Sequence, residues 1–305
     1  MKMIKIQYLL RNRNIILILS LATGLIWGKG AQWTETTTLP ALAIVMTLSV
    51  MGITGDTFRS LRTLMTPALT GIVMNYVVLG GIILGLSKLF IHDEALWSGF
   101  VILAAVPPAV AVIPFTIFLK GDTDFSLIGT ISAYLGALLI TPLMVLLFIG
   151  TSFVDPLKLM IITIELIFAP LLFARILIMT GIARLIEPIK GDITNWSFFL
   201  VSYTIVGLNQ QVFLTQTLSL LPVAIISFAS TFLLGWIIGL FCKIARLDKK
   251  KTTSIVLLGT LKNYGLAGGL ALSFFDTKTA LPSTVSVVFM IIYIIWLELK
   301  KKWSE

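Results

Sequence analysis

The sequence contains little charge and almost none of the residues that bind metals or form disulfides. Charged residues make up 12% of its 305 residues, against about 25% in soluble domains. One cysteine, Cys242, and one histidine, His92, exclude a disulfide framework and a metal site built from several thiolates or imidazoles. An enzyme embedded in a membrane would need a nucleophile or a cluster of carboxylates and histidines. We therefore expect neither an enzyme nor a bound cofactor.

The sequence is instead rich in long apolar runs, because 57% of its residues are hydrophobic. A soluble fold of this size cannot bury so much apolar surface. A helix that spans a bilayer needs about 20 mostly apolar residues, so we expect a single all-α membrane domain with about ten transmembrane helices. The predicted segments are 14–28, 38–54, 66–90, 95–119, 124–150, 156–180, 196–214, 218–244, 252–275 and 281–299.

The distribution of basic residues predicts the orientation of these helices. Most of the 23 lysines and arginines fall in the N-terminus, the C-terminus and the loops after even-numbered segments. Cytoplasmic loops carry an excess of Lys and Arg, so we expect a multi-pass protein of the cell (inner) membrane with both termini in the cytoplasm. The net charge of +9 then reflects topology and contact with lipid, and not binding to nucleic acid.

Two of the ten segments are interrupted, and they hold corresponding places in the two halves of the chain. The fourth contains Pro107, Pro108 and Pro114, and proline removes a backbone donor and breaks a helix. The ninth runs through residues 259–269 with four glycines, Lys262 and Asn263. Ten helices that divide into two inverted five-helix repeats, with broken helices 4 and 9 that cross, are a common plan of secondary transporters. A proline kink and a glycine-rich packing face are the alternative.

Short motifs in both halves carry a family resemblance. Residues 51–54 read MGIT, 107–113 read PPAVAVI, 120–122 read KGD, 141–142 read TP and 263–267 read NYGLA. In order and spacing they resemble the MGLT turn, the PGGxxSN break, the RGN run, the closing TP and the QNSGLA stretch of the bile acid:sodium symporter family.

The resemblance implies an architecture and a function. Panel-like helices would cover 14–54 and 156–214, and core-like helices with the crossed breaks would cover 66–150 and 218–299. Substrate would bind in the cleft between panel and core, and alternating access would move one against the other. Members of the family carry small organic anions such as bile acids, pantothenate, keto-acids and sulfur-containing acids. We therefore expect a secondary transporter for an organic anion.

The family couples transport to two sodium ions, and the resemblance places some of their ligands in this chain. Ser126 and Thr130 match the serine and threonine of the fifth segment. Asn75 falls on a glutamine of the third segment and is a shorter substitute. Hydroxyl and amide oxygens of this kind suit a hard cation.

Other sodium ligands are missing. The Ser-Asn pair of the first break falls on Val112 and Ile113, the glutamate of the second break falls on Leu258, and the following glutamine falls on Lys262. Aliphatic side chains cannot coordinate sodium, and the anionic ligand is gone. The resemblance thus implies degraded sodium sites with a fixed cation beside one of them.

Inserting a lysine into the core of a membrane costs free energy, so such a residue is a functional candidate by default. Lys262 would replace a sodium ion by donating to the same carbonyls, to Asn75 or to Thr130. It would otherwise act in proton coupling or bind a substrate carboxylate or sulfonate, and a purely structural lysine is the remaining interpretation. Pro108, Asn263 and Tyr264 would flank it.

Glu165 in the sixth segment is a second embedded charge. It would pair with Lys262, carry a proton or line a wet cleft. Several functions stay open beside the leading one: a conventional sodium-coupled organic-anion symporter, an arsenite-type permease, a channel and a binding protein that no longer transports. The permease resemblance is weaker because such carriers use a cysteine at the first break, whereas Cys242 lies in the eighth segment.

Overall fold

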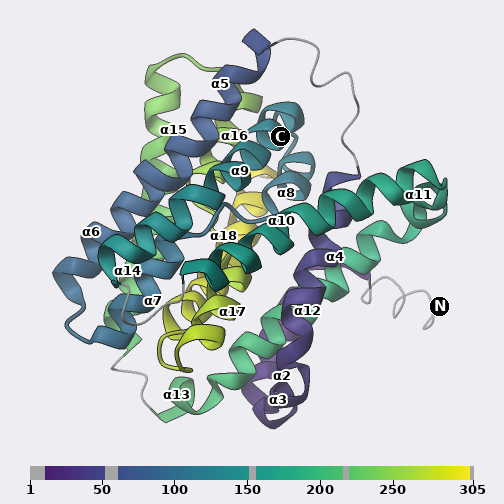
Figure 1. The fold of residues 1–305 in the computed structure, drawn as a ribbon. Coiled ribbons are helices and arrows are strands. Elements are labelled where there is room, and N and C mark those ends of the chain that lie inside the picture. Colours follow the sequence, from purple (N-terminus) through teal and green to yellow (C-terminus); the bar gives the residue numbers. More distant parts are fainter. Residues whose placement is uncertain (1–10, 52–60, 151–155, 216–219, 303–305) are drawn as a thin grey trace.

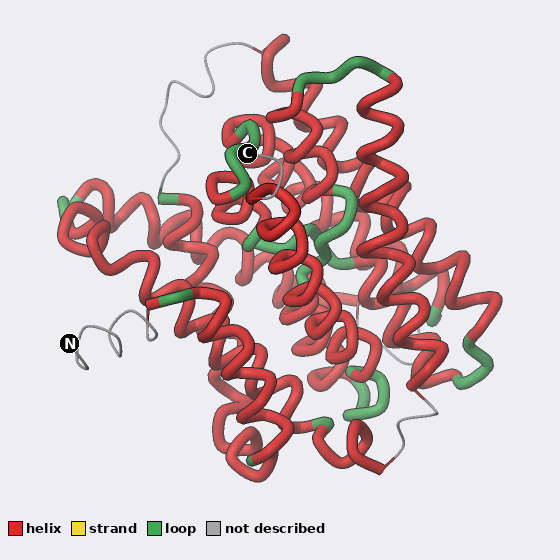
Figure 2. Tube along the Cα trace, turned by 180° about the vertical axis from the view of Figure 1, so that it is seen from behind, coloured by secondary structure: helices red, strands yellow, loops and turns green. Residues whose placement is uncertain are grey.

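The computed structural model describes residues 11–51, 61–150, 156–215 and 220–302, and these are helical almost throughout. No strand occurs in the described ranges (Figure 1). Short loops lie inside the helical mass as well as at its ends (Figure 2). The helices are α2 (Arg13–Ile26), α3 (Ala31–Thr34), α4 (Thr38–Val50), α5 (Leu61–Ile72), α6 (Gly80–Phe90), α7 (Glu94–Ala105), α8 (Val112–Phe118), α9 (Thr123–Phe148), α10 (Pro156–Met179), α11 (Ile182–Ile186), α12 (Lys190–Leu208), α13 (Gln210–Thr215), α14 (Leu221–Phe228), α15 (Leu234–Ile244), α16 (Lys249–Leu258), α17 (Tyr264–Phe274) and α18 (Leu281–Lys302). The all-α prediction is confirmed.

Each predicted apolar segment falls on one helix or on consecutive helices. Four helices are long and apolar enough to cross a membrane, namely Leu64–Phe90, Thr123–Phe148, Leu221–Ile244 and Leu281–Lys300. Two further pairs qualify if each bent pair is one span, with bends of 99° and 96°. The protein is therefore a multi-pass membrane protein, and the count of ten spans stays a prediction. Residues 52–54 of the MGIT stretch lie outside the described ranges.

The third and eighth segments each contain a π-helical stretch that the sequence analysis did not foresee. Helices α5 and α6 are joined by η4 (Val73–Leu79), and α14 and α15 are joined by η7 (Ala229–Leu233). π-Helical turns are rare and are frequent at functional sites. The order of interruptions, a π-turn and then a break in the next segment, is thus the same in the two halves of the chain.

The helices form two groups. Helices α2, α3 and α4 pack on α12 and lie together at the lower right of Figure 1. In the second group α5 and α7 pack on α9, and α14 and α17 pack on α18. Helix α10 contacts both α4 and α9. The apolar core of the second group includes Leu79, Phe100, Leu257 and Tyr293, all of them buried.

An ion pair outside the membrane-spanning segments joins two parts of the second group. Asp93 is the N-cap of α7 and accepts a hydrogen bond from the N–H of Leu96 at 3.1 Å. Its carboxylate also accepts from Lys278, in the loop before α18. The hydrogen bond from Lys278, followed by that from Leu96, lowers the pKa of Asp93 below its ordinary value. The loop before α18 is thereby tied to the start of the first broken helix.

Candidate functional site

The two breaks lie against each other inside the protein. The chain leaves helix after α7 and passes through Pro107 and Pro108 before α8 begins. It leaves helix again after α16 and passes through residues 259–263 before α17. Pro108 and Lys262 face each other in an antiparallel bridge. Helix α17 packs on α7 and α16 packs on α8, so the predicted meeting of the two broken helices is confirmed.

Two backbone hydrogen bonds join the breaks. The N–H of Ala109 donates to the carbonyl of Leu261 at 2.9 Å, and the N–H of Asn263 donates to the carbonyl of Pro107 at 3.0 Å. Inside a membrane every backbone polar group needs a partner in the protein. Each break therefore supplies hydrogen-bond partners for the other.

Lys262 is fully buried at this crossing. Its Nζ donates to the carbonyl of Ala104 at 2.6 Å and to that of Val106 at 2.9 Å. The same nitrogen lies 4.8 Å from the centroid of the Tyr76 ring, a distance at which a cation is attracted to the ring face. Among the described residues, no carboxylate lies within ion-pair distance of Lys262. The ammonium is thus held by two carbonyl dipoles and an aromatic face.

The carbonyls at the C-terminal end of α7 need hydrogen-bond donors from outside the helix. A helix leaves its last four carbonyls without intrahelical donors, and this end carries a partial negative charge that favours cations. Besides the two bonds from Lys262, the carbonyl of Ala105 accepts from Thr141 at 2.7 Å. The carbonyl of Val106 also accepts from Asn75 Nδ2 at 3.2 Å. Of the contacts expected for Lys262, those with the break carbonyls are the ones formed.

Two buried oxygens near the breaks have no hydrogen-bond partner among the described residues. They are Oδ1 of Asn75 and Oγ1 of Thr130, two of the residues that resemble sodium ligands. Ser126 differs, because its hydroxyl accepts a hydrogen bond from Thr116 at 2.7 Å. Unpaired buried acceptors are rare in proteins. Asn75 and Thr130 therefore retain oxygen atoms of the kind that bind a hard cation.

The three aliphatic residues at the sodium positions are packed and not available for coordination. Val112 and Ile113 begin α8 and are buried. Leu258 ends α16 and is fully buried. A Cβ built at Gly129 would lie 2.9 Å from Cδ1 of Leu258, so the leucine side chain lies directly on α9. The chain therefore offers hydrocarbon at the place where the resemblance implies a carboxylate.

Asn263 and Tyr264 have local partners. Asn263 caps α17, with Oδ1 accepting from the N–H of Leu266 at 3.0 Å and Nδ2 donating to the hydroxyl of Tyr134 at 2.9 Å. Tyr264 donates its hydroxyl to the carbonyl of Thr260 at 3.3 Å. Tyr134 thus connects α9 with the second break. The space left beside Lys262 and Asn263, against α4 and α12, is only ≈ 20 Å³, about the size needed for one water molecule.

Glu165 is not part of this crossing. It lies on α10 with its side chain exposed to the surroundings of the protein. Within the described chain it makes no ion pair with Lys262. The structure therefore brings Lys262, Asn75, Pro108, Asn263 and Tyr264 together around the breaks and leaves Glu165 outside the group.

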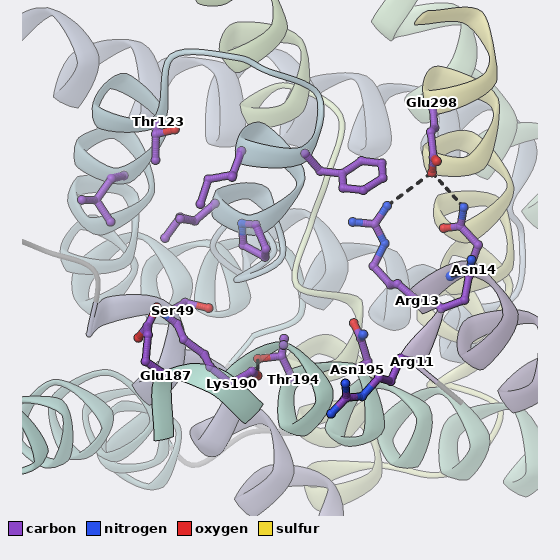
Figure 3. Close-up of a pocket in the computed structure, with 17 residues that line it drawn as sticks. Arg11, Arg13, Asn14, Ser49, Thr123, Glu187, Lys190, Thr194, Asn195 and Glu298 are labelled. Atoms are coloured by element: carbon purple, nitrogen blue, oxygen red, sulfur yellow. Dashed lines mark hydrogen bonds and ion pairs between the residues drawn. The ribbon is translucent and has the colours of Figure 1, made fainter. Parts of the chain in front are cut away.

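A large cavity of ≈ 690 Å³ lies next to α8, and none of the residues 107–111 or 259–264 of the crossing lines it. One wall is apolar and comes from α8, with Ile113, Ile117 and Phe118. The facing wall is polar and comes mainly from the start of α2, the end of α4 and the start of α12. Figure 3 labels its residues Arg11, Ser49, Glu187, Lys190, Thr194 and Asn195.

Of the residues that line this cavity, the sequence analysis proposed only Ile113 as a site residue. Arg13 and Asn14 at the start of α2 meet Glu298 near the end of α18 (Figure 3). Asn14 Nδ2 donates to Oε2 of Glu298 at 2.8 Å, and Nη2 of Arg13 lies 3.6 Å from the same oxygen. The available signal was a set of charges at the ends of the first and last segments, which the orientation prediction places on one side of the membrane.

Comparison with known proteins agrees with this architecture. Residues 15–299 match the SBF-like CPA transporter family. The chain is 22% identical to the uncharacterized sodium-dependent transporter YocS of Bacillus subtilis (strain 168), over 81% of this chain and 77% of the relative. It is 24% identical to the probable sodium/metabolite cotransporter BASS3, chloroplastic, of Oryza sativa subsp. japonica, over 83% of this chain and 61% of the relative.

The two facing broken helices, the family model and both relatives agree on a membrane transporter and not an enzyme. Because the match covers nearly its whole length, this chain belongs to the SBF-like CPA transporter family. The resemblance to bile acid:sodium symporters that the motifs indicated is confirmed.

Proposed function

We propose that the protein is a secondary active transporter that moves a small organic anion by alternating access. The panel, residues 14–54 and 156–214, and the core, residues 66–150 and 218–299, are its moving parts. The support is the crossing of the broken helices, the family and the cavity of ≈ 690 Å³ between α8 and the starts of α2 and α12. Both termini lie on the cytoplasmic side of the (inner) membrane. Because residues near both ends of the chain line the cavity, it opens toward the cytoplasm.

The observation that carries the mechanism is the position of the Lys262 ammonium. It binds the carbonyls of Ala104 and Val106 at the end of α7, and Leu258 holds hydrocarbon where the resemblance implies a carboxylate. A fixed cation at the C-terminal end of a helix stabilises the partial negative charge there, as a bound cation would. Lys262 therefore replaces a sodium ion, and the usual coupling to two sodium ions is absent. If Lys262 also releases and takes up a proton during the cycle, it couples transport to protons.

A conventional sodium-coupled symporter is the second candidate. One relative is named a sodium-dependent transporter and the other a probable sodium/metabolite cotransporter. The oxygens of Asn75 and Thr130 that have no partner in the described chain are suitable ligands. The two candidates differ in one property. Sodium should stabilise a sodium-coupled symporter against unfolding. It should not change the stability of a transporter in which Lys262 replaces the ion.

The first experiment measures thermal unfolding in detergent while sodium replaces choline, at several pH values. A ligand at about 100 times its dissociation constant adds about 2.7 kcal/mol of apparent stability. We expect no sodium-specific shift for the wild type. In the double variant Leu258→Glu/Lys262→Gln, which restores the two family residues, we expect a saturable shift. The matched control Leu258→Gln/Lys262→Gln has no carboxylate and should not respond. Saturable stabilisation of the wild type by sodium would establish the second candidate.

Transport itself is measured as counterflow in proteoliposomes with labelled pantothenate, pyruvate and taurocholate. A carrier shows saturable flux and counterflow, whereas a channel shows no counterflow. If a proton gradient drives uptake in the wild type and not in Lys262→Gln, the lysine couples protons. If uptake follows the substrate gradient alone in both proteins, the lysine is a fixed charge. Binding without any flux would identify a protein that no longer transports.

A further inference from the structure

Arg13 connects the two walls of the large cavity. It is the first residue of α2, and its guanidinium carbon lies 4.7 Å and 4.2 Å from the ring centroids of Phe115 and Phe118 on α8. Its Nη2 lies 3.6 Å from Oε2 of Glu298 on α18. Figure 3 shows Arg13, Asn14 and Glu298 together at one side of the cavity, and Lys190 and Glu187 at the other. Arg13 is thus in contact with α8 and α18 while it belongs to α2.

The guanidinium of Arg13 has donors to spare. Its Nε and Nη2 are buried and make no hydrogen bond within the described chain. These two nitrogens form one edge of the guanidinium plane, and such an edge binds a carboxylate through two parallel hydrogen bonds. The other two basic residues among those that line the cavity form ion pairs, one at a shorter distance than Arg13 and one with an exposed carboxylate. Arg11 lies 3.1 Å from Asp192, and Lys190 lies 3.6 Å from Glu187, whose side chain is largely exposed.

The two walls of the cavity define what else a ligand must offer. Along α8 the wall is hydrocarbon and aromatic, with Ile113, Ile117 and Phe118. The facing wall carries hydroxyl and amide groups, from Ser49, Thr194 and Asn195. It also carries the charged side chains of Arg11, Lys190 and Glu187. A volume of ≈ 690 Å³ lies within the range of about 300–1,000 Å³ that is typical of sites for organic ligands. The cavity therefore fits a molecule with an apolar body and one acidic group.

We infer that the carboxylate of the transported anion binds to Nε and Nη2 of Arg13, in place of Glu298, with its apolar body against Ile113, Ile117 and Phe118. This inference rests on the proposed function, because it assigns a binding site to the substrate of that transporter. Arg13 is then a specificity-determining residue that selects a monocarboxylate over its neutral analogue. Asn14 keeps its hydrogen bond to Glu298 when the carboxylate of the ligand binds to Arg13.

The test uses a cysteine in the cavity. In a Cys242→Ser background, Ser49→Cys places a thiol on the polar wall, and its reaction with N-ethylmaleimide is followed in lipid nanodiscs. The probes are octanoate, 4-phenylbutyrate and cyclohexanecarboxylate, each paired with its primary amide. We expect at least one carboxylate to slow labelling saturably, and its amide to have no such effect. The amides control for effects on the lipid.

Two variants should shift this protection in opposite directions. Arg13→Gln should raise the half-protecting concentration at least about tenfold, since it removes charged hydrogen bonds. Glu298→Gln should lower it, because a competing carboxylate is gone. Arg184→Gln, an exposed arginine outside the cavity, should behave like the wild type. If Arg13→Gln is too unstable to purify, the direction of Glu298→Gln still decides the question.

Three results would overturn the inference: no protection by any of the three carboxylates, equal protection by the amides, or unchanged protection in Arg13→Gln and Glu298→Gln. The proposed function is judged separately by counterflow. Uptake of an organic anion without protection at Ser49→Cys would retain the transporter and place its substrate elsewhere. Protection without flux would retain the site and contradict transport.

Discussion

Replacing Gly71 by alanine should separate the two helices that position Asn75 and Thr130. Helix α5 packs on α9 at this point. A Cβ built at Gly71 would lie 2.2 Å from the carbonyl oxygen of Gly129 and 2.5 Å from its Cα. An ordinary contact begins at 3.4 Å, so the helices must move apart by 1.2 Å. Small residues at helix interfaces allow such close approach in membranes.

The energetic effect can be worked from this geometry. Overpacking typically costs about 1–3 kcal/mol, and here the obstacle is backbone, which cannot rotate away. Alanine regains up to about 1 kcal/mol of helix propensity. We therefore expect Gly71→Ala to destabilise the protein by about 2 kcal/mol or more, which corresponds to a fall in Tm on the order of 5 °C. Transport should fall as well, because Asn75 lies one helical turn further along α5 and η4.

The assay is thermal unfolding in detergent, followed by intrinsic tryptophan fluorescence. Gly81→Ala is the matched control, because a Cβ at exposed Gly81 meets nothing within 4 Å. The control should unfold at the wild-type temperature or slightly above it. If Gly71→Ala unfolds at the same temperature as Gly81→Ala, then α5 and α9 do not make backbone contact at Gly71, and the reasoning is wrong.

Two further predictions concern hydrogen bonds of the first broken helix. The hydrogen bond from Lys278 lowers the pKa of Asp93, so the stabilisation is present at neutral pH and is lost as the pH falls below the ordinary value of 3.8. Because the pair is exposed, Asp93→Asn should cost at most about 1 kcal/mol and remove this part of the acid dependence of Tm; an unchanged acid profile would contradict the pair. Thr141→Val should cost about 1–3 kcal/mol by leaving the carbonyl of Ala105 unpaired. Thr23→Val loses only hydrogen bonds to carbonyls of its own helix and should change Tm little; equal Tm values for both variants would contradict the contact.

The sequence was informative where a structural feature depends on neighbours in the chain. Prolines at 107 and 108 remove donors wherever they occur in a helix, so the first break could be predicted from the local sequence alone. The glycines around Lys262 likewise predicted the second break from local sequence. The long apolar runs predicted the helices because they too are local features of the chain. The π-helical stretches η4 and η7 were missed because neither contains a proline or glycine that would mark a change in the helix.

The cavity could not be predicted, because its residues are distant in sequence. Asn14 and Glu298 are 284 positions apart, and only the packing of α2 against α18 brings them together. The suggested pairing of Glu165 with Lys262 shows the opposite problem. It rested on a similar depth in the membrane, but depth does not determine the direction in which a side chain points. The Glu165 residue is exposed and makes no ion pair with Lys262 in the described chain, whereas the two carbonyls at the end of α7 bind the lysine.

The chemistry of the crossing limits how this transporter is driven. A sodium ion can leave the crossing with the substrate and carry its gradient into the cycle. An ammonium tethered to the backbone at Lys262 stays in the protein, so a permanently charged lysine holds the broken helices together without adding any driving force. The exchangeable species that remains at Lys262 is its proton. One proton that moves with a monocarboxylate carries no net charge across the membrane, so only the pH difference drives this step. One pH unit supplies about 1.4 kcal/mol, which corresponds to about tenfold accumulation of substrate. Accumulation without sodium would therefore require that Lys262, or another group, titrates during the cycle, whereas a fixed charge at Lys262 leaves facilitated equilibration of the anion.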